Sequence, residues 1–166
     1  MPVVFYCSVP LAWFLKDERT PFTDTAFELL ETEEAWVPYL WRLEFPNALL
    51  FAERKKRLGR EQRLEILDNA AQLVLRTDPA LPDIRSLSAL AERRALTVYD
   101  ASYLELALRS GFDLITLDRK LADAAAAEGV AAHAPGRSSA AQVRRRYESR
   151  MVAIMPPCAC PGGPWK

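Results

Sequence analysis

Two aspartates in this sequence are spaced so that one metal ion could bind both. Asp100 opens an apolar helical pattern that ends at Gly111, and Asp118 follows an apolar run from Phe112 to Leu117. A helix rises about 1.5 Å per residue and a strand about 3.3 Å, so an outgoing helix and a returning strand of these lengths roughly match. We therefore expect both carboxylates at one end of the fold. The alternative is that each aspartate only caps a helix.

Glu44 is a third candidate ligand. It lies within one helical turn of an apolar stripe formed by Leu40, Leu43, Ala48, Leu49 and Ala52. A buried carboxylate without a partner is costly, and a divalent cation shared with the two aspartates would provide that partner. A hard divalent cation suits this set because such ions prefer oxygen ligands. The alternative is a surface glutamate paired with Arg42 or a nearby lysine.

The composition predicts one soluble domain with a substantial core. Of the 166 residues, 50% are hydrophobic and 27% are charged, and 22 basic residues balance 22 acidic ones. The net charge gives no indication of a polyanionic partner, but the charge distribution does. A basic block beginning Arg54, Lys55, Lys56 and Arg57 could hold a polyanion near a metal site, and solvated helix faces are the alternative.

Short apolar runs separated by helical patterns predict an α/β fold, with a central parallel sheet flanked by helices on both faces. The expected strands are Val3 to Tyr6, Ala35 to Val37 and Phe112 to Leu117. Ser8 is expected to cap the first helix. We interpret Leu64 to Leu75 and Ile84 to Ala91 as two amphipathic helices around a break at Asp78-Pro79.

The sequence predicts a cytoplasmic protein that does not enter a membrane. No run approaches the roughly 20 apolar residues of a membrane span. The apolar start, Pro2 to Leu15, lacks the basic region and cleavage site of a signal peptide. Three cysteines form no disulfide framework, and the lone His133 leaves no zinc set.

Three ordered segments resemble the PIN-domain ribonucleases, and specifically the VapC toxins of bacterial toxin–antitoxin pairs. They are Val4 to Val9 with Asp17-Glu18, Val37-Pro38 to Leu49, and Tyr99-Asp100-Ala101 to Leu121. The resemblance implies a PIN-like domain over residues 1–132, with 133–166 as a flexible or atypical tail rich in Pro, Gly, Ser and Arg. It also implies an endoribonuclease toxin that usually dimerises and is blocked by a small VapB-like antitoxin.

The resemblance assigns roles residue by residue. Glu44, Asp100 and Asp118 match acidic positions that bind Mg²⁺ or Mn²⁺ and activate water for cleavage of RNA phosphodiesters. Supporting polar positions match Ser8, Asn47 and Thr116, and the basic block from Arg54 to Arg57 would help to hold the RNA backbone.

Tyr6 departs from the family pattern, because it stands where the first acidic residue should end the first strand. A tyrosine is neutral near pH 7, so one charge and one ligand are lost, and its ring could occupy the place of the ion. Pro46 adds a second departure, since it removes a backbone hydrogen bond inside the Glu44 helix. Two hypotheses stay open: an active metal-dependent ribonuclease, or a catalytically impaired PIN-fold binding module.

Overall fold

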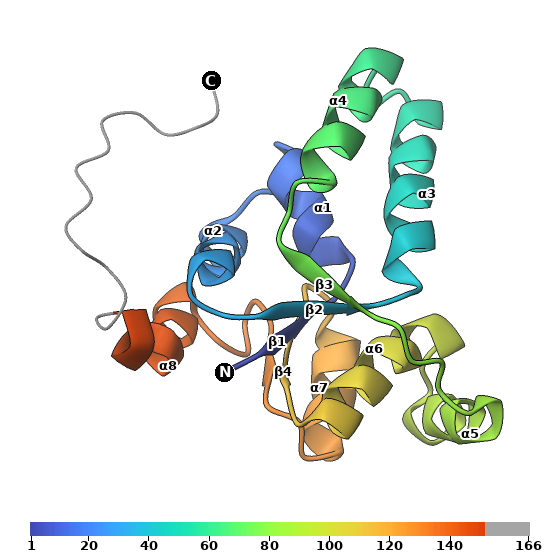
Figure 1. Ribbon diagram of the computed structural model, residues 1–166, viewed down its shortest axis with the longest axis vertical. Helices are drawn as coiled ribbons and strands as arrows, with labels where there is room; N and C mark the ends of the chain where they lie inside the picture. Colours follow the sequence, from blue (N-terminus) through green and yellow to red (C-terminus); the bar gives the residue numbers. More distant parts are fainter. Residues whose placement is uncertain (152–166) are drawn as a thin grey trace.

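The computed structural model describes residues 1–151, with side chains described as far as Tyr147. It is built around a five-stranded parallel sheet of order β3-β2-β1-β4-β5 (Figure 1). The strands are β1 (Val3–Phe5), β2 (Ala35–Pro38), β3 (Leu75–Asp78), β4 (Asp113–Ile115) and β5 (Ala132–His133). The expected α/β class, with a parallel sheet, is confirmed.

Helices cover both faces of this sheet, and α3 and α4 extend beyond it as a packed pair (Figure 1). The helical segments are α1 (Ser8–Phe14), α2 (Pro21–Glu28), the short 3-10 helix η1 (Leu29–Glu31), α3 (Trp41–Arg54), α4 (Arg60–Ala70), α5 (Ile84–Arg94), α6 (Val98–Ser110), α7 (Arg119–Ala127) and α8 (Ala140–Met151).

Successive side chains of the central strands point to opposite faces of the sheet and contribute to two different hydrophobic clusters. Val4 of β1 faces a cluster built with α3 to α7, whereas Val3 and Phe5 face a second cluster built with α1, α2 and α8. In the neighbouring strand β4, Leu114 and Ile115 divide between the clusters in the same way. Because both faces are covered, β1 is apolar throughout and β4 is apolar after its first residue, Asp113, as expected for a parallel sheet.

Two local predictions are wrong. Leu75 does not end a helix, because α4 stops at Ala70 and Leu75 begins the edge strand β3, where it pairs with Ala35. Ser8 does not cap α1 with its side chain. Cys7 occupies the cap position, and the Ser8 hydroxyl instead accepts a hydrogen bond from the Leu117 backbone N–H at 3.3 Å.

The segment after residue 132 continues the fold as far as the described chain extends. β5 pairs with β4, and α8 buries Val143 and Tyr147 in the second cluster. Within the expected tail, His133, Ala134, Val143 and Tyr147 are therefore buried in the fold. The composition did not reveal this, because α8 is rich in arginine and carries few apolar residues. Residues 152–166 lie outside the described residues, and the domain boundary at 132 stays a prediction.

Asp113, at the start of β4, anchors this C-terminal segment. Its buried carboxylate accepts hydrogen bonds from Arg146 at 2.5 and 3.0 Å and from the Tyr147 hydroxyl at 2.8 Å, and it also faces His133 Nε2 at 3.4 Å. Burial alone would raise the pKa of Asp113, but the hydrogen bonds from His133, Arg146 and Tyr147 outweigh burial and hold the pKa well below its usual range.

Pro46 lies inside α3 as expected, and it leaves the Arg42 carbonyl without the helical N–H four residues later. We predict that Pro46→Ala raises the free energy of unfolding by about 1–3 kcal/mol, because alanine restores that donor. Chemical denaturation followed by circular dichroism measures the change. Pro21→Ala is the matched control: Pro21 is exposed at the first turn of α2, so no comparable gain is expected. A less stable Pro46→Ala protein would contradict the prediction.

Candidate active site

The candidate site forms where β1 and β4 end side by side. Phe5 pairs with Ile115, and the Tyr6 backbone N–H donates to the Ile115 carbonyl at 2.9 Å. Tyr6 directly follows β1, while Thr116 follows β4 and leads to Asp118. These positions lie at the carboxyl edge of a parallel sheet, where α/β proteins commonly place their ligands.

Asp100 reaches this edge from the first turn of α6. The cap of that helix is Thr97, three residues before Asp100, and the two form a reciprocal capping box. Asp100 Oδ2 accepts from the Thr97 hydroxyl at 2.7 Å and from the Thr97 N–H at 3.3 Å. Asp100 Oδ1 accepts from the Tyr6 hydroxyl at 2.7 Å. Both oxygens of Asp100 are therefore already hydrogen-bonded.

Asp118 caps α7, as the alternative interpretation of this residue held. Its Oδ1 accepts from the Lys120 N–H at 2.7 Å and the Leu121 N–H at 3.2 Å. The Asp118 N–H donates in turn to the hydroxyl of buried Thr116 at 3.0 Å. Its second oxygen, Oδ2, accepts no hydrogen bond from the residues that the structure describes, so capping leaves one oxygen available.

Glu44 is half-buried on the first turn of α3 and is held by a tyrosine. The hydroxyl of buried Tyr103 donates to Glu44 Oε2 at 2.5 Å. The rings of Tyr103 and Tyr6 pack edge to face with centroids 4.8 Å apart. Arg42, the partner suggested by the alternative interpretation, donates instead to Thr77 at 3.3 Å. The two tyrosines thus bring Glu44 and Asp100 into one site.

The charges of all three carboxylates affect the pKa of one side chain, Tyr6. Burial raises the pKa of Tyr6, and the hydrogen bond to Asp100 and the charges of Asp100, Glu44 and Asp118 raise it further. Tyr6 therefore stays neutral at pH 7. Burial also raises the pKa of Glu44. The hydrogen bond from Tyr103 lowers this pKa and the charge of Asp100 raises it, and the net direction is upward. Within the described residues, none of these three carboxylates pairs with a lysine, arginine or histidine.

The donor chemistry of this site fits a hard divalent cation, since the charges of three carboxylates all raise the pKa of Tyr6 and none of the three has a cationic partner among the described residues. The arrangement is not ready-made, because residues 1–151 contain no group of three or more acidic, histidine or cysteine side chains placed to hold an ion. The obstacle is Tyr6, whose hydroxyl occupies Asp100 Oδ1. An ion at Asp100 Oδ1 would compete with that hydroxyl for the same oxygen.

Two polar residues of the site were missed in the sequence. Thr97 is part of a Thr-x-x-Asp pattern before an apolar run, which is a recognisable capping box. Tyr103 lies inside the apolar helical pattern that runs from Asp100 to Gly111, and its hydroxyl needs a partner because the residue is buried. Of the predicted supporting residues, Ser8 and Thr116 lie at the site, and Asn47 is exposed on α3.

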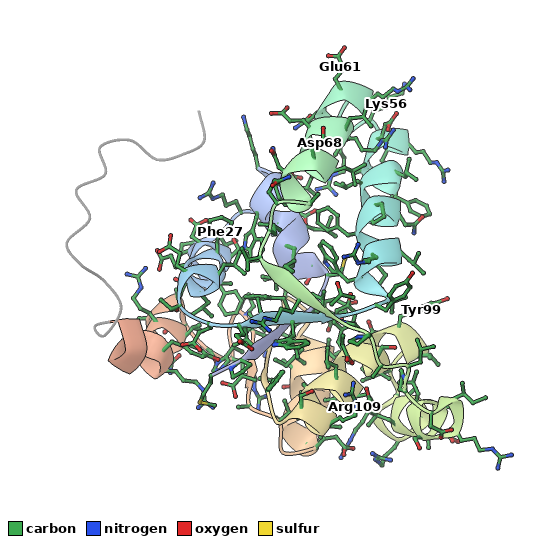
Figure 2. The ribbon with its side chains drawn as sticks, viewed as in Figure 1. Phe27, Lys56, Glu61, Asp68, Tyr99 and Arg109 are labelled. Carbon is green, nitrogen blue, oxygen red and sulfur yellow. The ribbon has the colours of Figure 1, made fainter. Side chains whose placement is uncertain are left out.

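The basic block lies away from the carboxylates, at the outer end of the α3–α4 pair. Figure 2 shows Lys56 at that end and Tyr99, the neighbour of Asp100, near the opposite end of α3. The rise of a helix places Arg54 about 15 Å from Glu44. Arg57 is paired with Asp17 at 2.7 Å and Glu18 at 2.6 Å. Arg54, Lys55 and Lys56 are exposed, so these three remain candidates for RNA contact.

This sheet order, with carboxylates at the edge formed by β1 and β4, defines an α/β protein of the nuclease-like PIN type. The PIN domain family model matches residues 8–127, and the chain belongs to that family. A curated relative, Ribonuclease VapC3 from Pyrobaculum aerophilum, is 28% identical over 125 residues, which cover 74% of this chain and 94% of the relative. The crystal structure of PAE2754 from the same organism shares the fold with a TM-score of 0.60 at 24% identity, over 80% of this chain and 83% of that one.

Proposed function

We propose that this chain is a divalent-metal-dependent endoribonuclease that acts as the toxin of a toxin–antitoxin pair. The observation that carries the proposal is the set of contacts that links Asp100 to Glu44 through Tyr6 and Tyr103. Asp118 lies at the end of β4, beside the end of β1. None of the three carboxylates forms an ion pair with a cationic side chain of the described residues. Membership of the PIN family and similarity to a relative named a ribonuclease support this assignment.

The three carboxylates would hold Mg²⁺ or Mn²⁺, which supplies activated water and neutralises charge on the RNA phosphate. The protein residues orient this set. Thr97 fixes Asp100 through the capping box, and the Tyr103 hydroxyl fixes Glu44 through one oxygen. Thr116 holds the backbone of Asp118 at the start of α7. Helix ends and the sheet edge thus orient each carboxylate separately, although residues 1–151 hold no ready-made group of three ligands for an ion.

Cleavage of RNA by the full chain tests this proposal. We predict slow cleavage in Mg²⁺ or Mn²⁺ that stops with EDTA, and a loss of at least about 100-fold in Asp100→Asn, because that variant lacks one charged ligand. Asp68→Asn is the matched control, since Asp68 is exposed on α4, away from the sheet (Figure 2). Cleavage that survives EDTA, or undiminished cleavage by Asp100→Asn, would refute the assignment.

A second candidate function is a binding module that keeps the fold and has lost the chemistry. The hydrogen bond from Tyr6 to Asp100 favours it, because a neutral phenol occupies a carboxylate oxygen that an ion would need. Such a module would bind RNA or a partner protein without cutting RNA. Binding of RNA with no cleavage in any divalent ion would support this candidate, whereas ion binding near or tighter than millimolar would count against it.

We further propose a VapB-like antitoxin and a second copy of the chain as partners in the cytoplasm. Large apolar side chains stand exposed beside Glu44 and Asp100: Leu43 is 60% exposed and Tyr99 is 62% exposed, and both adjoin a carboxylate in sequence. This surface suits a protein partner laid across the acidic site. No helix among the described residues is long and apolar enough to cross a membrane.

The basic block gives a separate prediction for RNA binding. The double substitution Lys55→Ala/Lys56→Ala should weaken RNA binding several-fold at low salt and make the affinity less dependent on salt, because each phosphate contact releases counterions. Fluorescence anisotropy with single-stranded RNA at several salt concentrations measures both effects. Arg57→Ala serves as the comparison and should change RNA affinity less, since Arg57 already pairs with Asp17 and Glu18. Equal effects of the Lys55→Ala/Lys56→Ala variant and the Arg57→Ala variant would contradict the proposed role of Lys55 and Lys56 in RNA binding.

A further inference from the structure

Among the residues that the structure describes, the hydroxyl of Tyr6 is the one hydrogen-bond donor to Asp100 that lies outside the capping box. Asp100 Oδ2 belongs to the start of α6, where Thr97 donates to it twice. Oδ1 points away from that box and receives the Tyr6 hydroxyl at 2.7 Å. A ligand that approaches Asp100 without disturbing the capping box therefore approaches Oδ1, the oxygen that already accepts the Tyr6 hydroxyl.

Tyr6 is firmly held in this position. Its backbone N–H is fixed by the Ile115 carbonyl at 2.9 Å, next to the central strand pair. Its ring packs against Tyr103 with centroids 4.8 Å apart, and Tyr103 is itself fully buried and bonded to Glu44. The hydroxyl is thus presented to Asp100 by a rigid backbone and a packed ring.

We propose that the Tyr6 hydroxyl is a built-in competitor of the divalent cation, so that ion binding at Asp100 and the Tyr6–Asp100 hydrogen bond exclude each other. This inference rests on the proposed function, because it concerns regulation of the same ion site. Tyr6 supplies a neutral donor where the ion would supply positive charge. The ion therefore binds only after the hydroxyl leaves, and its apparent affinity is lowered by the strength of that bond.

Tyr103 has a different role in this scheme. Its hydroxyl occupies only Oε2 of Glu44, and Oε1 accepts no hydrogen bond from the residues that the structure describes. Tyr103 is thus a positioning residue that orients Glu44 and leaves an oxygen open. The two tyrosines resemble each other chemically, yet only Tyr6 lies in the path of the ion.

Binding of Mn²⁺ to the full chain, followed by electron paramagnetic resonance of the free ion, tests the proposal. Tyr6→Phe removes the hydroxyl and keeps the ring against Tyr103, so we expect it to bind Mn²⁺ about tenfold more tightly or better, as expected for loss of a hydrogen bond to a charged group. Tyr99→Phe is the matched control and should bind like the native chain, because Tyr99 is exposed. Asp100→Asn should bind weakly, with or without Tyr6→Phe.

Equal or weaker Mn²⁺ affinity in a folded Tyr6→Phe protein would overturn the inference, even if the native chain cleaves RNA. A gain in affinity without cleavage by either protein would uphold the inference and overturn the proposed function instead. Absence of Mn²⁺ binding in both proteins would overturn both. If Tyr6→Phe fails to fold, the assigned ring resonance of ¹³C-labelled Tyr6 in the native chain decides. It should shift with Mg²⁺ saturation, and an unchanged resonance at saturation would overturn the inference.

Discussion

Replacing Tyr6 with aspartate is expected to raise Mg²⁺- or Mn²⁺-dependent RNA cleavage by about 100-fold or more. The substitution removes the hydroxyl from Asp100 Oδ1 and places a carboxylate at the end of β1, where the charges of Glu44, Asp100 and Asp118 already raise the pKa of Tyr6. A fourth charged ligand strengthens ion binding, and one well-placed electrostatic interaction in an active site commonly contributes a factor of 100 to 1,000 to the rate, on the order of 3 kcal/mol. Single-turnover cleavage of a labelled RNA measures the gain.

The same substitution should make stability depend on the ion. Without a divalent ion, four carboxylates repel one another and the ring packing against Tyr103 is lost, so the melting temperature of Tyr6→Asp should fall below that of the native chain. Added Mg²⁺ or Mn²⁺ should restore it, because a ligand that binds the folded state stabilises that state. Thermal unfolding with and without the ion follows both effects.

Tyr6→Asn is the control for this experiment, because it has nearly the same size as aspartate and lacks the charge. It should lose the ring packing like Tyr6→Asp, gain little cleavage, and show a small response to the ion. Equal gains in cleavage for the aspartate and asparagine variants would show that removal of tyrosine, rather than the added charge, is what matters. No cleavage by either variant would indicate that Pro46 prevents activity or that the ribonuclease assignment is wrong.

The site could be predicted from the sequence only in part, for reasons that particular residues show. Asp100 and Asp118 follow a helix-turn-strand spacing that places them at one end of the fold, and the structure brings them to the same sheet edge. The hydrogen bond between Tyr6 and Asp100 joins residues 94 positions apart, and that between Tyr103 and Glu44 joins residues 59 apart. No local sequence pattern encodes such pairs. The hydrogen bonds from the two tyrosines to the carboxylates can therefore be seen only in the three-dimensional structure.

The sequence predicts the strands that are buried on both faces of the sheet. The prediction fails at the edges of the sheet. β1 and β4 lie in the centre, and their short apolar runs are recognisable as strands. The edge strand β3 reads Leu-Arg-Thr-Asp and is partly exposed, so its pattern does not identify it as a strand. The α8 helix was missed because only Val143 and Tyr147 of its described side chains are buried, and specific contacts with Asp113 hold it in place.

Substitution of Asp113, which holds α8 in place, has the largest expected effect on stability. Asp113→Asn should lower the free energy of unfolding by about 3 kcal/mol at pH 7, because it removes the charge that holds Arg146 and leaves the hydrogen bonds of a buried cluster incomplete. The value lies at the lower end for a broken buried pair, since the Arg146 side chain is 39% exposed and can recover water. Chemical denaturation of the full chain measures the loss. Asp123→Asn is the control, because its pairing with Arg137 is exposed and should contribute under about 1 kcal/mol.

The pH dependence of the free energy of unfolding of the native chain should show the contribution of Asp113. The pKa of Asp113 is depressed in the folded state relative to the unfolded value of about 3.9, so the folded protein retains the charged form at lower pH. The contribution of Asp113 is therefore fully present above about pH 5 and is lost as the pH falls through 4 toward the folded pKa. Native and Asp113→Asn proteins should differ most near neutrality and converge in acid. A difference that stays constant from pH 7 to pH 3 would show that the charge of Asp113 does not produce the effect.

Asp113→Asn should leave the chemistry of the candidate site intact, because Asp113 begins β4 whereas Thr116 and Asp118 follow its end. Well below the melting temperature, cleavage per folded molecule should therefore match that of the native chain. If the variant is destabilised and also loses cleavage while folded, α8 and the sheet edge at Asp118 must be coupled through β4. Stability and activity measured on one variant thus separate the role of the C-terminal helix as an anchor from any role in positioning the carboxylates.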